Sequence, residues 1–451
     1  MILFISNSGE CLPIAWRLKR EGAEVGVYVH NPKHRPNYAG IMERVTIGGL
    51  KKALKLADKV IFDITHPNQK KPEDIALLKM FGLKTGSPSV FGPVADKLKK
   101  DQLVIGASAW SEEIEMDRKL GSDIAEKLGL AISETHDFKA LKQGVKFLKG
   151  RKDRWVLKPH HNADLDLTYV ERYPGELLRK FEGELPRRVG EKFEFMLQRV
   201  VEGVEISTEG WFDGEKWHHF NHTIEDKRLM QGGLGPAIGS QGNTCWIKGV
   251  QAGKPAPLLV AELTKLTPWL KTAGYVGPVD INAIVSEEDH RPYFLEFTPR
   301  CGYDALYCLL TLLKGSLTEF WTKGFKGEFQ YPGFASSQRL SIPPYPYANR
   351  ELLASFAKEV PIEGSLEKMA WFWGEDIRMA GETPALLCCA GSDGILGVVT
   401  GRGATVGEAV SKVYRRLKSM RVGAYMQYRL DGAKRPLAAI ETLQKWGINV
   451  F

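Results

Sequence analysis

Strand-like and helix-like segments alternate over the first 85 residues, and this alternation limits the fold more than any other feature of the sequence. Three apolar segments have the length of buried strands: Ile2–Ser6, Glu24–His30 and Lys59–Thr65. Helix-like patterns separate or follow them, one ending near Arg20 and one covering Pro72–Phe81. Strands joined through helices form parallel sheets with helices on their faces. We therefore expect a parallel α/β domain in the N-terminal part of the chain.

Length and composition predict a globular protein of several domains. The chain has 451 residues, of which 43% are hydrophobic and 26% charged, values typical of a protein with a sizeable core and two to four domains. No apolar run approaches the roughly 20 residues that span a bilayer. The first residues show neither a basic leader nor a cleavage pattern. We expect a cytoplasmic protein with no membrane partner.

The distribution of charge, cysteines and glycines argues against a nucleic-acid-binding protein, a disulfide-stabilised protein and a dinucleotide-binding protein. The net charge of +8 comes from basic residues interspersed with acidic ones, whereas a nucleic-acid-binding surface concentrates them. We expect no nucleic-acid partner, and small anionic substrates fit the charge equally well. The six cysteines lack CxxC spacing and are expected to be reduced, buried thiols. Ser8-Gly9 after the first strand does not complete G-x-G-x-x-G, so no dinucleotide site is expected.

The remaining chain mixes strands, helices and one glycine-rich segment. Helix patterns resume at Ser111, and Met230–Asn243 is expected to be a loop because of its glycines. A Pro/Tyr-rich stretch at Ser341–Tyr347 lies near an expected domain boundary. The other expected elements are strands at Arg154–Lys158, Phe195–Val201, Glu205–Phe212, Val276–Val285 and Pro292–Phe297, and helices at Leu258–Ala273 and Thr405–Met420.

Two carboxylates lie on a predicted hairpin. Asp280 is in VGPVDINAIV and Glu296 in PYFLEFTPR, with the turn SEEDHR between the two strands. Such a hairpin would bring both side chains to the same face and the same end. Hard oxygen ligands suit Mg²⁺, which keeps substrate phosphates in its coordination shell. A plain surface hairpin is the alternative for the pair taken alone.

Other polar residues at strand ends fit a nucleotide site. Lys158 ends an apolar strand, where its ammonium group can meet a phosphate oxygen or extend to solvent. Gln198, Arg199 and Val200 finish another strand, and Glu205 opens the next after a glycine turn. This arrangement predicts an edge for an adenine ring at Gln198 and Val200, with the Glu205 carboxylate on the ribose hydroxyls. Each residue taken singly is better explained by a structural role.

The order of these motifs resembles an ATP-grasp enzyme, and more narrowly glycinamide ribonucleotide synthetase (phosphoribosylamine–glycine ligase). That family has a D-H-K-R stretch, a G-G-M-G loop and a strand with L-E-F-N-x-R-x-G. The corresponding segments here are EDKR at 225–228, GGLG at 232–235 and LEFTPRCG at 295–302. NSGECLPIAW, SPSVFGPVAD and GRGATVGEAVSKVY are similar to its first turn, its F-G-P turn and an element of its last domain.

The resemblance implies an α/β and α+β protein with the ATP-grasp fold. Its domains would be an N-terminal parallel α/β (pre-ATP-grasp) domain at 1–110, the ATP-grasp domain at 111–335 and a β-rich C-terminal domain at 336–451. It implies a ligase that joins a small-molecule carboxylate to an amine through an acyl phosphate, as a monomer or homodimer. The cofactors would be ATP and Mg²⁺, with Mn²⁺ as the substitute metal.

The resemblance also assigns roles to single residues. Arg118 takes the place of the lysine that opens the ATP domain and, with Lys158, would balance phosphate charge. Thr298 takes the place of an asparagine in the metal site, where Asp280 would compensate for its weaker oxygen. Lys227 and Arg228 would stabilise the transferring phosphoryl group. Arg300 would hold the acyl phosphate or the substrate, and the loop at 230–243 would close over the site.

The sequence departs from the family at the substrate and phosphate loops. The family's glycine-rich phosphate loop is replaced by His160–Asp166, and its arginine–histidine turn by Glu10-Cys11. Fewer backbone N–H groups can then approach the phosphates. We therefore expect a rebuilt substrate pocket, and glycine and phosphoribosylamine are not assumed as substrates. A nucleotide-binding protein without catalysis is the first alternative function. A dehydrogenase is the second, and the missing dinucleotide motif disfavours it.

Overall fold

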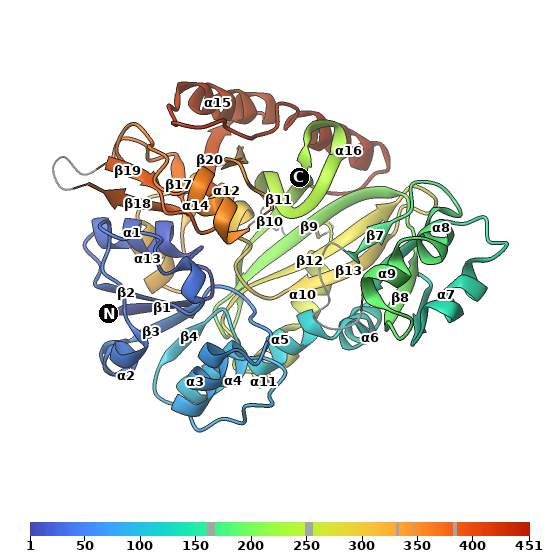
Figure 1. Cartoon of the computed structure of the whole chain (residues 1–451), viewed down its shortest axis with the longest axis horizontal. Helices are drawn as coiled ribbons and strands as arrows, with labels where there is room; N and C mark the ends of the chain where they lie inside the picture. Colours follow the sequence, from blue (N-terminus) through green and yellow to red (C-terminus); the bar gives the residue numbers. More distant parts are fainter. Residues whose placement is uncertain (160–166, 249–255, 331–332, 348, 382–385) are drawn as a thin grey trace. The chain divides into compact units, whose positions relative to one another are not determined.

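The computed structural model describes the chain except residues 160–166, 249–255, 331–332, 348 and 382–385 (Figure 1). The chain forms two compact units. Unit 1 consists of Met1–Glu115, Glu205–Asn282 and Phe297–Phe451, and unit 2 of Met116–Val204 and Ala283–Glu296. The domain boundaries expected from the sequence remain a prediction. In the described part of the chain, no helix is both long and apolar enough to cross a membrane.

A parallel four-stranded sheet opens unit 1, as the alternation of strands and helices predicts. Its strands lie in the order β2-β1-β3-β4, with Ile2 of β1 paired to Val25 of β2 and Lys59 of β3. The fourth strand was not predicted, because three residues carry too short a pattern to recognise. The elements are β1 (Ile2–Ser6), α1 (Leu12–Arg20), β2 (Val25–Val29), α2 (Ile47–Leu56), β3 (Lys59–Phe62), α3 (Pro72–Met80), α4 (Phe91–Leu98), β4 (Leu103–Ile105) and α5 (Ala109–Met116).

Both faces of this sheet are buried, which explains why its strands are uniformly apolar rather than alternating. Along β1, Ile2 and Phe4 belong to the core that contains α1. Leu3 and Ile5 belong to a second core with residues of α2, α3 and α4. Successive strand residues point to opposite faces, so the single run ILFIS supplies both cores.

A tight turn follows β1 and positions the first residues of α1. The Gly9 amide donates to the Ser6 hydroxyl at 2.7 Å. Gly9 has a φ of 84°, and a Cβ there would lie 2.7 Å from the Leu12 side chain. Only glycine fits this conformation and this contact comfortably. Glu10 and Cys11 follow directly, at the carboxyl edge of the parallel sheet.

A large sheet contains the predicted hairpin at Asp280 and the strands around it. Its order is β13-β12-β9-β10-β11-β16-β20-β17. The strands are β9 (Gly203–Phe212), β10 (Trp217–Met230), β11 (Leu234–Lys248), β12 (Gly277–Ser286), β13 (Pro292–Thr298), β16 (Phe334–Ser341), β17 (Phe372–Gly374) and β20 (Ile395–Gly403). Strands β16, β17 and β20 come from the segment beyond residue 333 and continue this sheet.

The prediction of a loop at 230–243 is wrong. Strands β10 and β11 form a long antiparallel hairpin, with Ile224 paired to Thr244 and a tip at Gln231–Gly233. From Gly242 onward, strand β11 also pairs with β16, so a backbone partner outside the segment holds its last glycine in a strand. The expected helix at 258–273 is two short helices, α10 (Val260–Lys265) and α11 (Thr267–Thr272), the second starting with a proline in its first turn.

Helices and a short hairpin complete the C-terminal part of unit 1. The expected helix at 405–420 is α15, and β20 and β16 are its nearest strands. The Trp246 indole on β11 donates to the Val450 carbonyl at 2.6 Å, which ties the last residues to the sheet. The elements are α12 (Tyr303–Leu312), α13 (Leu317–Thr322), α14 (Arg350–Phe356), α15 (Val406–Ser419), α16 (Lys434–Lys445), and the hairpin of β18 (Ile377–Ala380) and β19 (Leu386–Cys389).

Unit 2 is built on an antiparallel sheet in the order β5-β8-β6-β7. Its core is aromatic: Phe195 stacks against Phe138 with ring centroids 5.2 Å apart, and Trp155 is fully buried. The elements are α6 (Arg118–Leu128), β5 (Thr135–Phe138), α7 (Leu141–Leu148), β6 (Trp155–Pro159), β7 (Tyr169–Val170), α8 (Glu176–Glu182), α9 (Leu185–Val189) and β8 (Phe195–Arg199). The sequence predicted β6 and β8 but not β5 or β7.

Candidate functional site

In unit 2, Arg118 lies close to the end of β6 and to Glu296. It is the first residue of α6, which Asp117 caps by accepting from the Lys119 and Leu120 amides. One guanidinium nitrogen of Arg118 donates to the Pro159 carbonyl at 3.0 Å. Burial lowers the pKa of Arg118, and the charge of Glu296 opposes that shift. The predicted phosphate cation and one predicted metal ligand are therefore neighbours.

Lys158 precedes Pro159 on β6 and pairs with Met196 of β8. Its side chain is half-buried, as expected for a lysine whose stem crosses apolar surface. The replacement loop at His160–Asp166 lies outside the described residues, so its part in phosphate binding stays a prediction.

The predicted adenine edge is already hydrogen-bonded within unit 2. Gln198 is buried on β8, paired with Val156 on one side and Thr135 on the other. The Val200 amide donates to the Arg154 carbonyl at 2.9 Å. A contact between this amide and a base would require that bond to open. The adenine contact at Gln198 and Val200 therefore remains a prediction.

In unit 1, Glu205 forms ion pairs instead of standing alone. Its carboxylate lies 2.7 Å from the Lys227 ammonium and 3.1 Å from the Arg435 guanidinium. Burial would raise the pKa of Glu205, but Lys227 and Arg435 together lower it. A ribose-binding role for Glu205 and a phosphoryl-binding role for Lys227 would each change this ion pair. Arg435 was not predicted, because it comes from a helix 230 residues further along the chain.

The tip of the β10–β11 hairpin is anchored to the C-terminal segment. Arg228 is exposed and donates to the Gly235 carbonyl at 2.8 Å across the hairpin. The Gly232 amide donates to Asp431 at 2.7 Å, and Arg429 donates to the Arg228 carbonyl at 3.1 Å. Arg429 is also paired with Asp431 at 2.8 Å. Lys227 and Arg228 therefore lie on a hairpin whose tip is held from outside.

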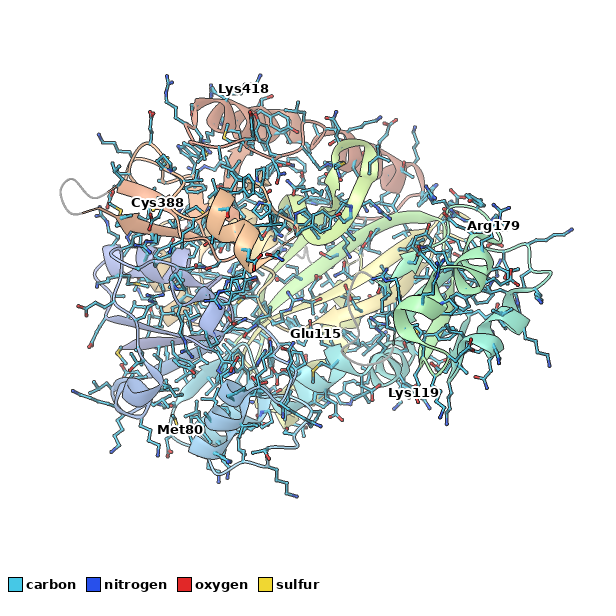
Figure 2. All side chains as sticks on the ribbon, viewed as in Figure 1. Met80, Glu115, Lys119, Arg179, Cys388 and Lys418 are labelled. Carbon is cyan, nitrogen blue, oxygen red and sulfur yellow. The ribbon has the colours of Figure 1, made fainter. Side chains whose placement is uncertain are left out.

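Arg300 is oriented by a carboxylate from α5. Its Nε lies 3.1 Å from Glu115 Oε1, and the other Glu115 oxygen accepts from the Thr65 hydroxyl. Glu115 is labelled in Figure 2. A cation fixed by a bonded carboxylate is preorganised for an anionic group. Thr65 follows β3, so this contact links Arg300 to the carboxyl edge of the N-terminal sheet.

Asp280 on β12 lies beside the Asn282 amide and the Glu209 carboxyl group. The Asn282 amide lies 3.4 Å from the Asp280 carboxylate, since both side chains project from the same face of the strand. Burial and the charge of Asp280 raise the pKa of Glu209 on β9 to about 8. A donor set of carboxylate and amide oxygens fits Mg²⁺. Asp280 belongs to unit 1 and Glu296 to unit 2, so their pairing on one ion stays a prediction. Thr298 is buried at the end of β13.

Four further acidic residues gather in unit 1 around one arginine. We call Glu10, Asp63, Asp304 and Glu375 the carboxylate cluster. Asp304 holds Arg339 in a bidentate pair, with N–O distances of 2.9 and 3.2 Å.

Glu10 and Glu375 of the carboxylate cluster face the same arginine, Arg339. Burial and the neighbouring Asp63 raise the pKa of Glu10 to about 7, against the opposing charges of Arg339 and Arg300. Burial raises the pKa of Asp63 to about 6, although Ser6, Tyr303 and Cys11 lie close enough to lower it. Asp63 is 1% exposed. The cluster therefore carries more potential negative charge than its arginine can balance.

One feature of the sequence indicated part of this cluster, although none of the recognised motifs contained it. Glu10 and Asp63 follow β1 and β3, and ligands of open parallel sheets bind outside the carboxyl ends of the strands. Glu375 and Asp304 come from distant segments and gave no comparable signal. Glu10 was noticed only as part of Glu10-Cys11, which replaces the expected arginine–histidine turn.

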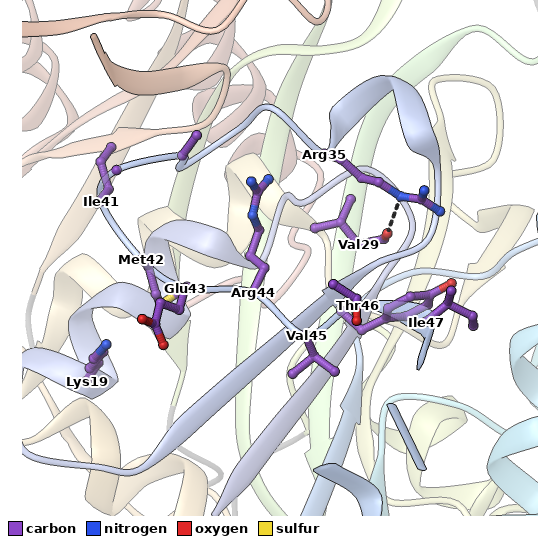
Figure 3. A pocket seen from close by; sticks show the side chains of 13 residues that line it. Lys19, Val29, Arg35, Ile41, Met42, Glu43, Arg44, Val45, Thr46 and Ile47 are labelled. Atoms are coloured by element: carbon purple, nitrogen blue, oxygen red, sulfur yellow. Dashed lines mark hydrogen bonds between the residues drawn. The ribbon is translucent and has the colours of Figure 1, made fainter. Parts of the chain in front are cut away.

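A hollow of about 740 Å³ elsewhere in unit 1 contains none of the predicted site residues (Figure 3). It is lined by β2 and by the segment from Ala39 to Ile47. Arg35 beside it donates to the Val29 carbonyl, and Arg44 donates to the Asn37 carbonyl at 2.6 Å. Both arginines of the hollow thus donate to backbone carbonyls. The residues that the sequence predicted for the site are those described above.

No model of a protein family matches the sequence, and no curated protein matches it. Solved structures do match over nearly the whole chain. A phosphoribosylamine–glycine ligase from Thermotoga maritima is 19% identical with a TM-score of 0.65, covering 96% of this chain and 100% of that chain. A biotin carboxylase from Campylobacter jejuni in a β,γ-ATP complex is 12% identical with a TM-score of 0.58, covering 100% and 97%.

A third similar structure is an N5-carboxyaminoimidazole synthetase from Staphylococcus aureus complexed with ADP. It is 10% identical with a TM-score of 0.52, and the match covers 92% of this chain and 97% of that chain. The similarity at these identities is one of fold. It confirms the predicted architecture, with a parallel sheet at the N-terminus and a mixed α/β and α+β chain beyond it. The chain has the ATP-grasp fold and is similar over its whole length to ligases that include phosphoribosylamine–glycine ligase.

Proposed function

We propose that this protein is an ATP-dependent ligase that joins a carboxylate to an amine through an acyl-phosphate intermediate. The observation that carries the proposal is the gathering, in unit 2, of Arg118, the end of β6 with Lys158, and Glu296. Cations and a metal-binding carboxylate at strand ends are what ATP phosphates require. The ATP-grasp fold and the oxygen donors around Asp280 support the same function.

The reaction balances in two steps. A carboxylate oxygen of the first substrate attacks the γ-phosphorus of ATP, the bond to the β–γ bridging oxygen breaks, and ADP leaves. The amine nitrogen then attacks the acyl carbon, and inorganic phosphate leaves with the C–O bond electrons while the amine loses a proton. Bound Mg²⁺ would neutralise charge on the phosphates, held by Asp280 and Glu296. Arg118 and Lys158 would bind the phosphates, and Arg300 would orient the substrate carboxylate.

The carboxylate cluster supports an amine substrate that arrives as an ammonium ion. Glu10 and Asp63 are neighbouring carboxyl groups whose pKa values burial raises, so a further positive charge would be favourable there. Burial raises the pKa of Glu10 to about 7, which suits a group that takes up a proton near neutral pH. An anionic phosphoribosyl group would meet repulsion at the same place.

A screen of phosphate release tests the proposal. Purified protein with ATP and Mg²⁺ is offered pairs of carboxylic acids and amines, with phosphate and amide product both measured. We expect release that requires one acid and one amine together, and release roughly a hundredfold slower or more from Glu296→Gln. Exposed Glu287→Gln, on the turn that links β12 and β13, is the matched control and should keep full release. Release independent of any acid and amine would contradict the ligase.

A nucleotide-binding protein with weak or no catalysis is the second candidate. The pairing of Lys227 with Glu205 at 2.7 Å favours it, because a catalytic lysine engaged by a carboxylate is less available to a phosphoryl group. Tight binding of ATP by calorimetry, without amide formation from any acid and amine pair, would identify this function.

A further inference from the structure

Two histidines and an aspartate, none of them used above, meet at the carboxyl edge of the N-terminal sheet. His30 directly follows β2, His66 follows β3, and Asp74 lies in the first turn of α3. Their side chains are 1%, 7% and 0% exposed. Strands β2 and β3 are the two neighbours of β1. The three side chains therefore join the loops on either side of the turn that carries Glu10.

Their donor atoms converge on one point. The Nε2 atoms of His30 and His66 lie 2.8 and 2.9 Å from the same oxygen, Oδ1 of Asp74, and the ligand atoms all lie within 4.8 Å of one another. Zinc takes imidazole nitrogen at about 2.0 Å and carboxylate oxygen at about 2.1 Å. Tetrahedral ligands at those bond lengths lie about 3.3 Å apart. A shift of about half an ångström per contact would admit the ion.

Hydrogen-bond partners orient His30 and Asp74 from the side away from their shared contact. The other ring nitrogen of His30 lies 3.3 Å from the Tyr28 hydroxyl. The second oxygen of Asp74 accepts from the Gln69 and Lys71 amides at 3.0 and 3.2 Å. Partners on the far side of metal ligands fix the tautomer of a histidine and the rotamer of a carboxylate.

An apolar shell closes one side of the group. The Phe91 ring lies 5.6 Å from the His30 ring and 5.0 Å from the His66 ring, measured between centroids. Two imidazoles and a carboxylate are the donors of zinc and of other divalent transition metals. We infer that His30, His66 and Asp74 bind one divalent transition-metal ion, zinc by their donor set, that clamps the loops after β2 and β3.

The alternative is a metal-free hydrogen-bonded group. In it both imidazoles are neutral and donate their Nε2 hydrogens to the one Asp74 oxygen, and the same distances result. The two states differ in tautomer: the metal requires the Nε2 lone pair of each imidazole, so each ring then carries its hydrogen on Nδ1 instead. Metal content and metal spectroscopy distinguish them directly, and neither measurement depends on ligase activity.

The experiment uses the full chain, without a histidine tag, produced in zinc-supplemented medium and dialysed without chelator. Elemental analysis is expected to find about one zinc per chain in the wild type. In His66→Gln and in His30→Gln the content should fall at least fivefold. His136→Gln is the matched control, because His136 is exposed and paired with Glu134 at 2.7 Å, and it should keep the wild-type content.

Cobalt gives a second measurement that does not rely on the variants folding. Wild-type protein stripped of zinc and loaded with Co²⁺ should develop visible d–d absorption, which added zinc removes. A strong chelator should lower the Tm of the wild type and of His136→Gln but not that of His66→Gln. Wild-type protein with less than a tenth of an equivalent of any transition metal, and no cobalt absorption, would overturn the inference. Full zinc content in both histidine variants would overturn it equally.

Discussion

Replacing Arg339 by methionine should destabilise unit 1 far more than neutralising its partner Asp304. Arg339 on β16 is largely shielded from solvent, with 13% of its side chain exposed, holds Asp304 through two N–O contacts of 2.9 and 3.2 Å, and faces Glu10 and Glu375. Methionine keeps the length of the side chain but removes the Arg339 charge from Asp304, Glu10 and Glu375. Removing one partner of a buried pair costs about 3–5 kcal/mol, and we expect Arg339→Met to lie at the upper end.

Asp304→Asn should cost about half as much, roughly 2 kcal/mol, because Glu10 and Glu375 remain as partners for Arg339. The negative charge of Asp304 raises the pKa values of both glutamates. Without that charge, one of them can ionise more easily and take its place. The double variant should be no less stable than Arg339→Met alone, giving a coupling energy of about 2 kcal/mol.

Urea unfolding of the four proteins, followed by tryptophan fluorescence at pH 5.5 and pH 8, measures these differences. The cost of Arg339→Met should shrink at pH 5.5, since uncompensated carboxyl groups are protonated there in the folded state. The cost of Asp304→Asn should change little. Equal costs for the two single variants, or costs that simply add in the double variant, would refute the shared role of Arg339.

Three further predictions concern the wild type and the metal pair. The folded-state pKa values of Glu10 and Asp63, about 7 and about 6, lie above those of an unfolded chain. Their contribution to the free energy of unfolding is therefore complete below about pH 4 and is lost as the pH rises through 6 to 7. The Tm should be higher at pH 5.5 than at pH 8, and an equal Tm would contradict the raised pKa values of these carboxyl groups. Glu296→Gln and Asp280→Asn should each lower ATP turnover by roughly a hundredfold or more while leaving the Tm nearly unchanged, and normal turnover in both would remove the metal site. Glycine with phosphoribosylamine should be poor substrates, which a direct assay of glycinamide ribonucleotide formation at ordinary enzymatic rates would disprove.

The sequence predicted those parts of the fold whose signals are local. Strand β1 and helix α1 have the predicted bounds because an apolar run, a glycine turn and a proline-led helix follow one another within 20 residues. The hairpin of β10 and β11 was predicted as a loop because its glycines dominate the local pattern. Its strand conformation depends on pairing with β16, about 95 residues away in the chain at Asn243 and Ser337.

The candidate site divides in the same way. Lys158 and Glu296 stand at strand ends within recognisable motifs, so their positions could be predicted. The ion pairs of other site residues could not be predicted, because they depend on segments distant in the chain. Examples are the pairing of Glu205 with Lys227 and Arg435, and the pairing of Arg300 with Glu115. The carboxylate cluster was missed for a further reason. An acidic residue gives no sign in sequence of whether it is solvated or buried, and burial is what makes Glu10 and Asp63 unusual.

Arg429 and Asp431 hold the tip of the β10–β11 hairpin across a sequence separation of 201 residues between Arg429 and Arg228. A chimaera that exchanges the C-terminal segment for that of a similar ligase would keep Lys227 and Arg228 but lose the groups that hold them. The β10–β11 hairpin and the C-terminal segment therefore depend on each other structurally. An exchange should succeed only when hairpin and C-terminal segment are transplanted together.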